Sequence, residues 1–288
     1  MTPSGATPPD KDQKTTEARQ TPEILLRLAS AFVLAAIALG AVIASPWSFL
    51  ALVIVAGGLL LWEWGGLTRG SGFDGTALIE AVCVAAVAIL VALGRPDLAL
   101  LILGATSVAL AFGSVSKPRA AWALTGLAYV AFPAWALVWL RDDPKLGVMA
   151  VLFVLAVAWT TDTASYVGGR CLGGPKLAPH ISPKKTWSGF IVGALTPALI
   201  GYAFALLLGG TSAWRLALVS IALALACQLG DLLESAIKRH FGAKDMSQLI
   251  PGHGGLFDRI DSLLLASVVA GLIALRNLAE PGAGLLIW

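Results

Sequence analysis

Long apolar stretches separated by short polar ones dominate the chain from residue 25 onward. A helix needs about 20 mostly apolar residues to cross the roughly 30 Å hydrocarbon layer of a bilayer. The pattern predicts spans near residues 25–44, 49–67, 76–93, 98–113, 121–140, 147–167, 189–209, 213–232 and 262–278. Ala and Leu dominate these stretches, and the ten-residue alternation typical of membrane strands is absent. We therefore expect an all-α polytopic integral membrane protein with about nine transmembrane helices.

The composition supports this prediction and sets one segment apart. Hydrophobic residues make up 57% of the 288 residues and charged residues 13%, whereas soluble domains carry about 25% charged residues. Residues 1–22 consist mainly of Thr, Pro, Asp, Lys and Gln and are too polar to bury a core, so we expect a disordered cytosolic tail there. The three cysteines are scattered singly, which argues against a zinc site.

Basic residues are unequally distributed between the two sides that nine spans would define. With a cytosolic N-terminus, 15 of the 20 Lys and Arg residues fall on the cytosolic side. The other five are Arg95, Arg141, Lys145, Arg215 and Arg276. Because positive residues accumulate in cytoplasmic loops, the distribution predicts a cytosolic N-terminus and a C-terminus on the opposite side.

Two polar stretches on the predicted cytosolic side differ from the rest of the chain. Residues 159–190 and 228–262 together hold six carboxylates, eight Lys or Arg residues and all three histidines. The chemistry should therefore lie in the C-terminal half. We divide the chain into the tail at 1–22, N-terminal transmembrane helices at 23–145 and a C-terminal transmembrane catalytic region at 146–288.

The second stretch begins with a polar helix face. Asp231, Glu234, Ser235 and Lys238 stand at i, i+3, i+4 and i+7, so a helix places them on one side. A charged cap at the membrane interface would account for Lys238. It would not account for Asp231, because a carboxylate in an apolar run costs a few kcal/mol.

Glycines and two further aspartates complete this stretch. Pro251-Gly252-His253-Gly254-Gly255 allows close backbone approach to a ligand, although a plain turn would use the same residues. Asp258 and Asp261 then share one face at the start of the last span. Carboxylates among cations and glycines are typical of a magnesium-phosphate site, because Mg²⁺ prefers oxygen ligands and Lys and Arg balance phosphate charge.

The run SAIKRHFGAKDMSQLIPGHGGLFDRID, residues 235–261, resembles the signature of the phosphatidate cytidylyltransferase (CDP-diacylglycerol synthase) family. The matching positions are Ser235, Lys238, Arg239, Lys244, Asp245, Pro251, His253, Gly254, Gly255, Asp258, Arg259 and Asp261. Upstream, Gly230-Asp231-Leu232, Asp162-Thr163 and the Ser182–Thr186 run resemble further elements of the family. Ser188 and Ser247 depart from it, since an acidic or amide residue and a glycine are usual at these positions. The resemblance covers roughly residues 150–280.

This resemblance implies the reaction of CTP with phosphatidate to give CDP-diacylglycerol and pyrophosphate. It also implies Mg²⁺ as cofactor, with a second cation left open, and Asp231 and Asp258 as its ligands. The implied catalytic residues are Asp231, Asp258, Asp261 and Lys238. The implied substrate-binding residues are Ser182, Lys184, Lys185, Ser235, Arg239, Lys244, His253 and Arg259. The roles of Asp162 and Glu234 stay open.

The same resemblance predicts a multi-pass protein of the inner (plasma) membrane with its active site facing the cytosol. The expected partners are CTP and membrane phosphatidate, without nucleic acid, and a homodimer is left open. Two alternatives remain. One is a cytidylyltransferase for another lipid phosphate, because nothing in the motifs recognises lipid tails. The other is a cation transporter, because acids within a membrane also mark ion pathways.

Overall fold

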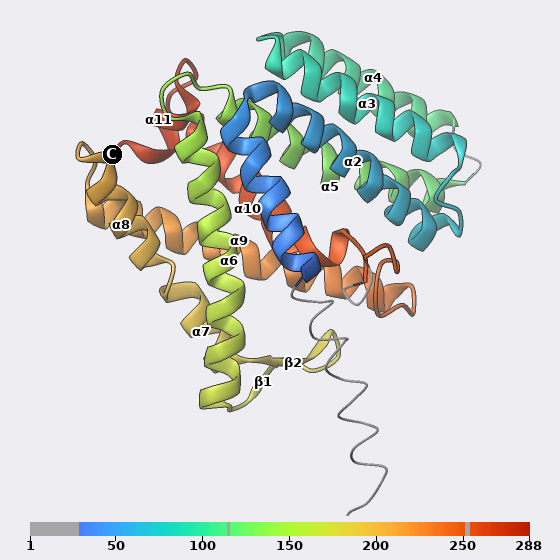
Figure 1. Ribbon diagram of the computed structural model, residues 1–288. Helices are drawn as coiled ribbons and strands as arrows, with labels where there is room; N and C mark the ends of the chain where they lie inside the picture. The colour runs from blue at the N-terminus through green and yellow to red at the C-terminus, as the bar shows by residue number, and fades with distance from the viewer. Residues whose placement is uncertain (1–28, 114–115, 251–253) are drawn as a thin grey trace, which may run out of the picture.

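The computed structural model describes residues 29–113, 116–250 and 254–288, and in them the apolar stretches form helices (Figure 1). The predicted tail at 1–22 and the segment Pro251 to His253 lie outside the described residues. A first helix covers Ala29–Ala44. The following long helices are α2 Pro46–Arg69, α3 Gly75–Ala92, α4 Pro96–Gly113, α5 Lys117–Arg141 and α6 Gly147–Leu172. The C-terminal helices are α7 Trp187–Leu195, α8 Ala198–Leu208, α9 Ala213–His240, α10 Phe257–Ala274 and α11 Pro281–Leu286.

Seven helical segments of the described residues are long and apolar enough to cross a membrane. These are α2 to α6, the α7–α8 segment Trp187–Leu208 and α9. The helix at Ala29–Ala44 is shorter, and α10 begins with three charges in its first five residues. Each predicted span thus overlaps a helix or a helix pair, and the first is described from residue 29 onward. The chain is an all-α, multi-pass membrane protein.

The predicted span at 189–209 is built from two helices rather than one. α7 ends at Leu195, and α8 begins at Ala198 after Thr196 and Pro197. Proline lacks the backbone N–H that a continuous helix would need at this point, which explains the interruption.

A small antiparallel hairpin lies in the polar stretch between α6 and α7, where the sequence pattern predicted no strand. β1 covers Lys176–Ala178 and β2 covers Ser182–Thr186, with Lys176 opposite Thr186 and Ala178 opposite Ser182. The hairpin projects from the helical body below α6 and α7 (Figure 1). It places the lysines of β2 beside α9, which β2 contacts.

The helices pack as two groups that meet at α10. Helices α2, α3, α4 and α5 pack on one another, and α6, α7, α8 and α9 form the second group. α10 contacts α5 from the first group and α6 and α9 from the second. Trp64 of α2, Tyr129 of α5 and Phe257 of α10 pack ring against ring where the groups meet, with centroids 5.3 to 5.9 Å apart.

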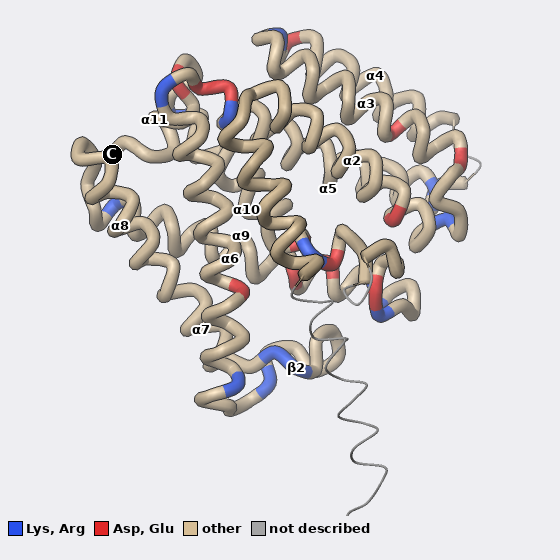
Figure 2. The backbone as a smooth tube through the Cα atoms, in the orientation of Figure 1, with Lys and Arg blue, Asp and Glu red and all other residues tan. Residues whose placement is uncertain are grey.

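Charged residues are concentrated toward the helix ends and the loops, whereas the middle of the bundle is largely uncharged (Figure 2). This distribution agrees with helices that cross a hydrocarbon layer, where a charge is costly. The hairpin, the end of α9 and the start of α10 carry charges on the same side of the bundle (Figures 1 and 2).

Candidate active site

A cavity of about 680 Å³ lies between α6, the hairpin, α7, α9 and α10. It falls within the range of small-molecule sites. Both polar stretches contribute to its wall. The predicted site residues that line it are Lys184, Lys185, Asp231, Lys238, Asp258, Arg259 and Asp261. The structure therefore brings seven of the predicted residues together, although they come from segments far apart in sequence.

Asp231 lies on α9 and pairs with a lysine of the hairpin. Its Oδ2 is 2.6 Å from Nζ of Lys185, and Ser235 Oγ donates to its Oδ1 at 3.4 Å, one helical turn away. The Asp231 side chain keeps 34% of its surface exposed. Its partners are two side chains that can rotate away, so this carboxylate can turn to a ligand in the cavity.

Lys238, near the end of α9, connects two acids. Its Nζ lies 2.6 Å from Oε2 of Glu234 and 2.6 Å from Oδ1 of Asp258. Glu234 is almost fully buried, and its Oε1 has no hydrogen-bond partner among the described residues. The end of α9 suits a cation, because the helix dipole places partial negative charge there. Lys238 thereby holds α10 against α9.

Asp258, in the first turn of α10, has both carboxylate oxygens engaged. Oδ1 faces Lys238, and Oδ2 accepts hydrogen bonds from the backbone N–H groups of Met246 at 3.0 Å and Gly255 at 2.8 Å. Burial opposes ionisation, but the bonds from Lys238 and the two N–H groups outweigh it and hold the pKa of Asp258 below the usual aspartate value.

Two further carboxylates face the same cavity. Asp261 lies one turn beyond Asp258 on α10, and Asp162 of α6 accepts a hydrogen bond from Ser262 Oγ at 3.0 Å. Burial and the negative charges of Asp231 and Asp162 raise the pKa of Asp261 above its ordinary value. Carboxylates from α6, α9 and α10 thus face one cavity.

The donors suit Mg²⁺ in kind, because they are carboxylate oxygens facing one polar cavity. No group of three or more His, Cys, Asp or Glu side chains within the described residues is arranged to hold a metal by itself. This arrangement is compatible with Mg²⁺, which is usually held by one or two carboxylates together with substrate phosphates and water. Asp231 is the more accessible of the two predicted ligands, because the oxygens of Asp258 are already engaged and only 6% of that side chain is exposed.

Four of the remaining predicted substrate-binding residues do not line the cavity. Arg239 donates to the carbonyls of Ile181 at 3.2 Å and Ala243 at 3.0 Å, so it braces the hairpin and the end of α9. Ser182 lies in β2, Lys244 is exposed after α9, and Ser235 contacts the cavity through Asp231. His253 is outside the described residues.

Sequence reasoning missed Glu63 of α2, which is 1% exposed. Its Oε1 accepts hydrogen bonds from Ser247 Oγ at 2.5 Å and Leu256 N at 2.8 Å, and its Oε2 accepts one from Phe257 N at 2.7 Å. The signal that singled out Asp231, an acid in an apolar run, was present at Glu63 as well. Ser247, where the family usually has glycine, therefore uses its hydroxyl to bind Glu63.

The second departure, Ser188, is also accounted for by local contacts. Its hydroxyl donates to the carbonyl of Gly173 and lies 3.0 Å from Oγ1 of Thr186, the N-cap of α7. Ser188 thus joins the end of α6 to the start of α7. Gly189 follows it, and a Cβ there would lie 2.6 Å from the carbonyl oxygen of Ser165. The glycine therefore permits α6 and α7 to approach closely beside the cavity.

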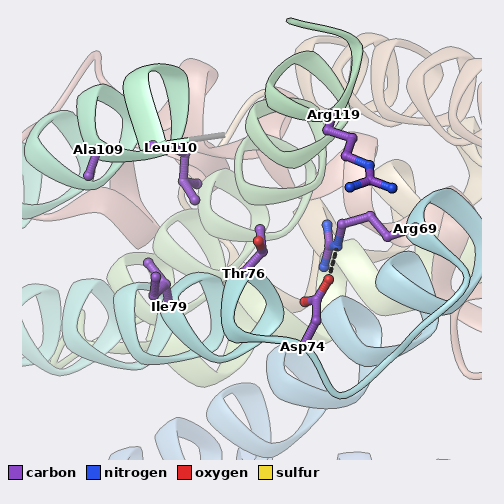
Figure 3. A pocket seen from close by; sticks show the side chains of 8 residues that line it. Arg69, Asp74, Thr76, Ile79, Ala109, Leu110 and Arg119 are labelled. Atoms are coloured by element: carbon purple, nitrogen blue, oxygen red, sulfur yellow. Dashed lines mark hydrogen bonds and ion pairs between the residues drawn. The ribbon is translucent and has the colours of Figure 1, made fainter. Parts of the chain in front are cut away.

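A second cavity, of about 270 Å³, lies among the N-terminal helices (Figure 3). Arg69 points toward Asp74 in it, at 2.8 Å, and also contacts the buried carboxylate of Glu80 at 3.1 Å (Figure 3). Arg119 lines the same cavity. None of the predicted site residues lies there, and two acids already balance Arg69, so we place the chemistry in the larger cavity.

Comparison with known proteins places the chain in a family. The phosphatidate cytidylyltransferase of Brucella suis is 44% identical over 165 residues, which are 57% of this chain and 61% of that protein. The phosphatidate cytidylyltransferase of Staphylococcus saprophyticus is 36% identical over 175 residues, which are 59% of this chain and 66% of that protein. The matched part thus spans somewhat less than two thirds of each relative. The model of the cytidylyltransferase family matches residues 25–275, which is most of the chain. This chain therefore belongs to the cytidylyltransferase family.

Proposed function

We propose that this protein is a phosphatidate cytidylyltransferase, which converts CTP and phosphatidate to CDP-diacylglycerol and pyrophosphate. The observation that carries the proposal is the convergence of the signature residues of α9, α10 and β2 on one cavity in a multi-pass membrane protein. Family membership and the names of the two relatives support a nucleotidyl transfer to a lipid phosphate.

In the proposed reaction, a phosphate oxygen of phosphatidate attacks the α-phosphorus of CTP. A new oxygen–phosphorus bond forms, the bond from the α-phosphorus to the bridging oxygen breaks, and pyrophosphate leaves with the electron pair. The attacking oxygen is already anionic near neutral pH, so no side chain needs to remove a proton. The protein must instead align two anionic substrates and balance their charge.

Lysines and arginines of the cavity would balance this charge. Lys184 and Lys185 reach the cavity from the hairpin, Lys238 from α9 and Arg259 from α10. These cations surround the carboxylates from different sides, as a triphosphate with several charged oxygens requires. Lys185 would exchange Asp231 for a phosphate oxygen when the substrate enters.

Mg²⁺ would be held by Asp231 with Asp258 or Asp261, and it would supply positive charge to phosphate oxygens of the substrates. The three carboxylates line one cavity, which supports a cation at this place. Because Asp258 is bound to Lys238 and to the 246–255 backbone, the role that its contacts support most directly is to orient Lys238 and α10.

We further propose that the site faces the cytosol of a cell whose inner membrane the helices cross. CTP is a soluble nucleotide of the cytosol, and phosphatidate lies in the bilayer, so a site at the cytosolic boundary meets both. The excess of basic residues on that side supports this orientation.

The decisive experiment is a transfer assay with purified full-length protein in detergent. Protein, Mg²⁺, labelled CTP and phosphatidate should give labelled CDP-diacylglycerol and an equal amount of pyrophosphate. ATP in place of CTP, or diacylglycerol in place of phosphatidate, should give no product. The variant Arg215→Ala, on the predicted opposite side, should behave as the wild-type protein.

Two outcomes would overturn the proposal. Transfer to another lipid phosphate but not to phosphatidate would keep the chemistry and change the substrate. If the protein transferred no cytidylyl group but moved cations across a proteoliposome membrane, the alternative of a transporter would replace the enzyme.

A further inference from the structure

Glu63 contributes a carboxylate from the N-terminal half of the chain to the base of the candidate active site. It lies in α2, more than 180 residues before its partners, and does not line the cavity. Its three hydrogen bonds go to Ser247, in the segment after α9, and to the backbone of Leu256 and Phe257. A buried carboxylate within a membrane span is costly unless its oxygens are satisfied, and these three bonds satisfy both of them.

The partners of Glu63 include the N-terminus of α10. The first N–H groups of a helix have no partner within the helix, and the N-cap residue Leu256 has no side chain that could accept from them. Glu63 accepts from the N–H groups of Leu256 and Phe257 instead, so a residue of α2 caps α10. A negative group is also favoured there by the helix dipole.

Glu63 and Asp258 each accept hydrogen bonds both from the segment after α9 and from the start of α10. Asp258 Oδ2 accepts from the backbone of Met246 and Gly255. Glu63 accepts from the residue after each of these, Ser247 and Leu256. Two carboxylates side by side thus tie the segment that follows α9 to the start of α10.

The approach of Glu63 leaves no room for a side chain at Gly255. A Cβ at this position would lie 2.7 Å from Glu63 Oε1 and 3.0 Å from Asp258 Oδ2. Gly255, a glycine of the family signature, is therefore required because the carboxylates of Glu63 and Asp258 occupy the space of a side chain.

We propose that Glu63 is a positioning residue for nucleotidyl transfer, which sets the place of Asp258, Arg259 and Asp261 by clamping the start of α10 to Ser247. This inference rests on the proposed function and extends it to a residue of the N-terminal helices. Glu63 acts through α10 and does not touch substrate, because Asp258, Arg259 and Asp261 line the cavity and Glu63 does not.

The clamp itself can be tested without activity. In Glu63→Gln the side chain keeps its size, but in either orientation its amide nitrogen, which donates, faces a backbone N–H, that of Leu256 or that of Phe257. We expect faster hydrogen–deuterium exchange in a peptide covering residues 254–262 of the detergent-solubilised protein, and unchanged exchange in a peptide covering 198–208. Unchanged exchange over residues 254–262 would overturn the clamp.

The effect on catalysis is tested in the same preparation. Glu63→Gln should lower kcat by roughly 10- to 100-fold, the scale seen when supporting partners of site ligands are removed, with the KM for CTP within about two-fold. Glu80→Gln is the matched control, since Glu80 is an equally buried acid of a transmembrane helix but pairs with Arg69. It should leave kcat near the wild-type value, even with a lower Tm. Faster exchange with unchanged kcat would overturn the positioning role.

Ser247 provides a second, milder route if Glu63→Gln does not fold. Ser247→Ala removes one of the three bonds and should lower kcat by a few-fold, and the double variant should be no worse than Glu63→Gln alone, because the two residues share one contact. If the loss in kcat of the double variant equalled the product of the losses of the two single variants, the two residues would not act through one contact. An inactive wild-type protein would instead refute the proposed function, and the exchange experiment would still decide the clamp.

Discussion

The ammonium of Lys185 lies 2.6 Å from the carboxylate of Asp231 and joins the β-hairpin to α9 across the cavity. The two side chains are 25% and 34% exposed, so solvent screens the pair and its contribution to stability is small. The contact brings a cation from one polar stretch to an acid of the other. In the proposed reaction the pair separates, so that Lys185 binds a phosphate oxygen of the substrate and Asp231 binds Mg²⁺.

Replacement of the two predicted metal ligands should separate chemistry from structure. Asp231→Asn should lower turnover by orders of magnitude and raise the Mg²⁺ concentration needed for half-maximal rate, because the amide lacks the charge that binds the cation. Its Tm should stay close to the wild-type value. Asp258→Asn should lower turnover and also Tm, since Asp258 holds Lys238 and the backbone at 246 and 255. Turnover against Mg²⁺ concentration and thermal unfolding in detergent measure both effects. Near-wild-type turnover in both variants would show that neither acid serves the metal.

Lys238 and Arg239 are adjacent in sequence but should differ in importance. Lys238 faces the cavity between Glu234 and Asp258, whereas Arg239 bonds to the carbonyls of Ile181 and Ala243. Charge-assisted contacts contribute about 1.5–3 kcal/mol, so Lys238→Ala should reduce kcat/KM by roughly 10- to 100-fold. It should also lower Tm, because two acids lose their partner. Arg239→Ala should change kcat/KM by about three-fold or less. Steady-state kinetics at varied CTP gives both values, and equal losses would contradict this division.

Gly189 should tolerate no side chain, because α6 and α7 approach each other there. A Cβ would lie 2.6 Å from the carbonyl oxygen of Ser165, and Gly189 also lines the cavity. Gly189→Ala should therefore lower both Tm and activity. Gly58→Ala in α2 is the control, since nothing lies within 4 Å of its Cβ and alanine favours a helix by about 1 kcal/mol over glycine. It should leave Tm unchanged or raise it. An equally stable Gly189→Ala variant would argue against the close helix contact.

The orientation of the chain can be determined with single cysteines in a protein whose three native cysteines are replaced. Pro179→Cys in the hairpin and Gln248→Cys after α9 should be protected from an impermeant thiol reagent in intact cells, and both should react after lysis. Pro144→Cys, in the loop between α5 and α6, should react from outside. All three positions are exposed. The reverse pattern would invert the topology and separate the site from cytosolic CTP.

The sequence by itself determined the class of fold and the segments that carry chemistry. Helices in a bilayer satisfy their backbone within one segment, so a local run of apolar residues is enough to predict each of them. The helical spacing of Asp231, Glu234, Ser235 and Lys238 is equally local and placed these residues on one face of α9. The resemblance from residue 235 to 261 required only the linear order of residues.

The tertiary structure decided how these segments meet. Three contacts join residues that are 20 to 184 positions apart in sequence. They are the ion pair of Lys185 with Asp231, the ion pair of Lys238 with Asp258 and the hydrogen bond of Ser247 to Glu63. No local periodicity encodes such contacts, because they depend on how two helices or a helix and a hairpin pack. Adjacent positions of a helix point about 100° apart, so the sequence indicated that Lys238 and Arg239 face different ways, but not which of them faces the cavity. It did not indicate that an acid of α2 caps α10. Which of several similar charged side chains face the cavity depends on how the helices pack, and this is decided only in the tertiary structure.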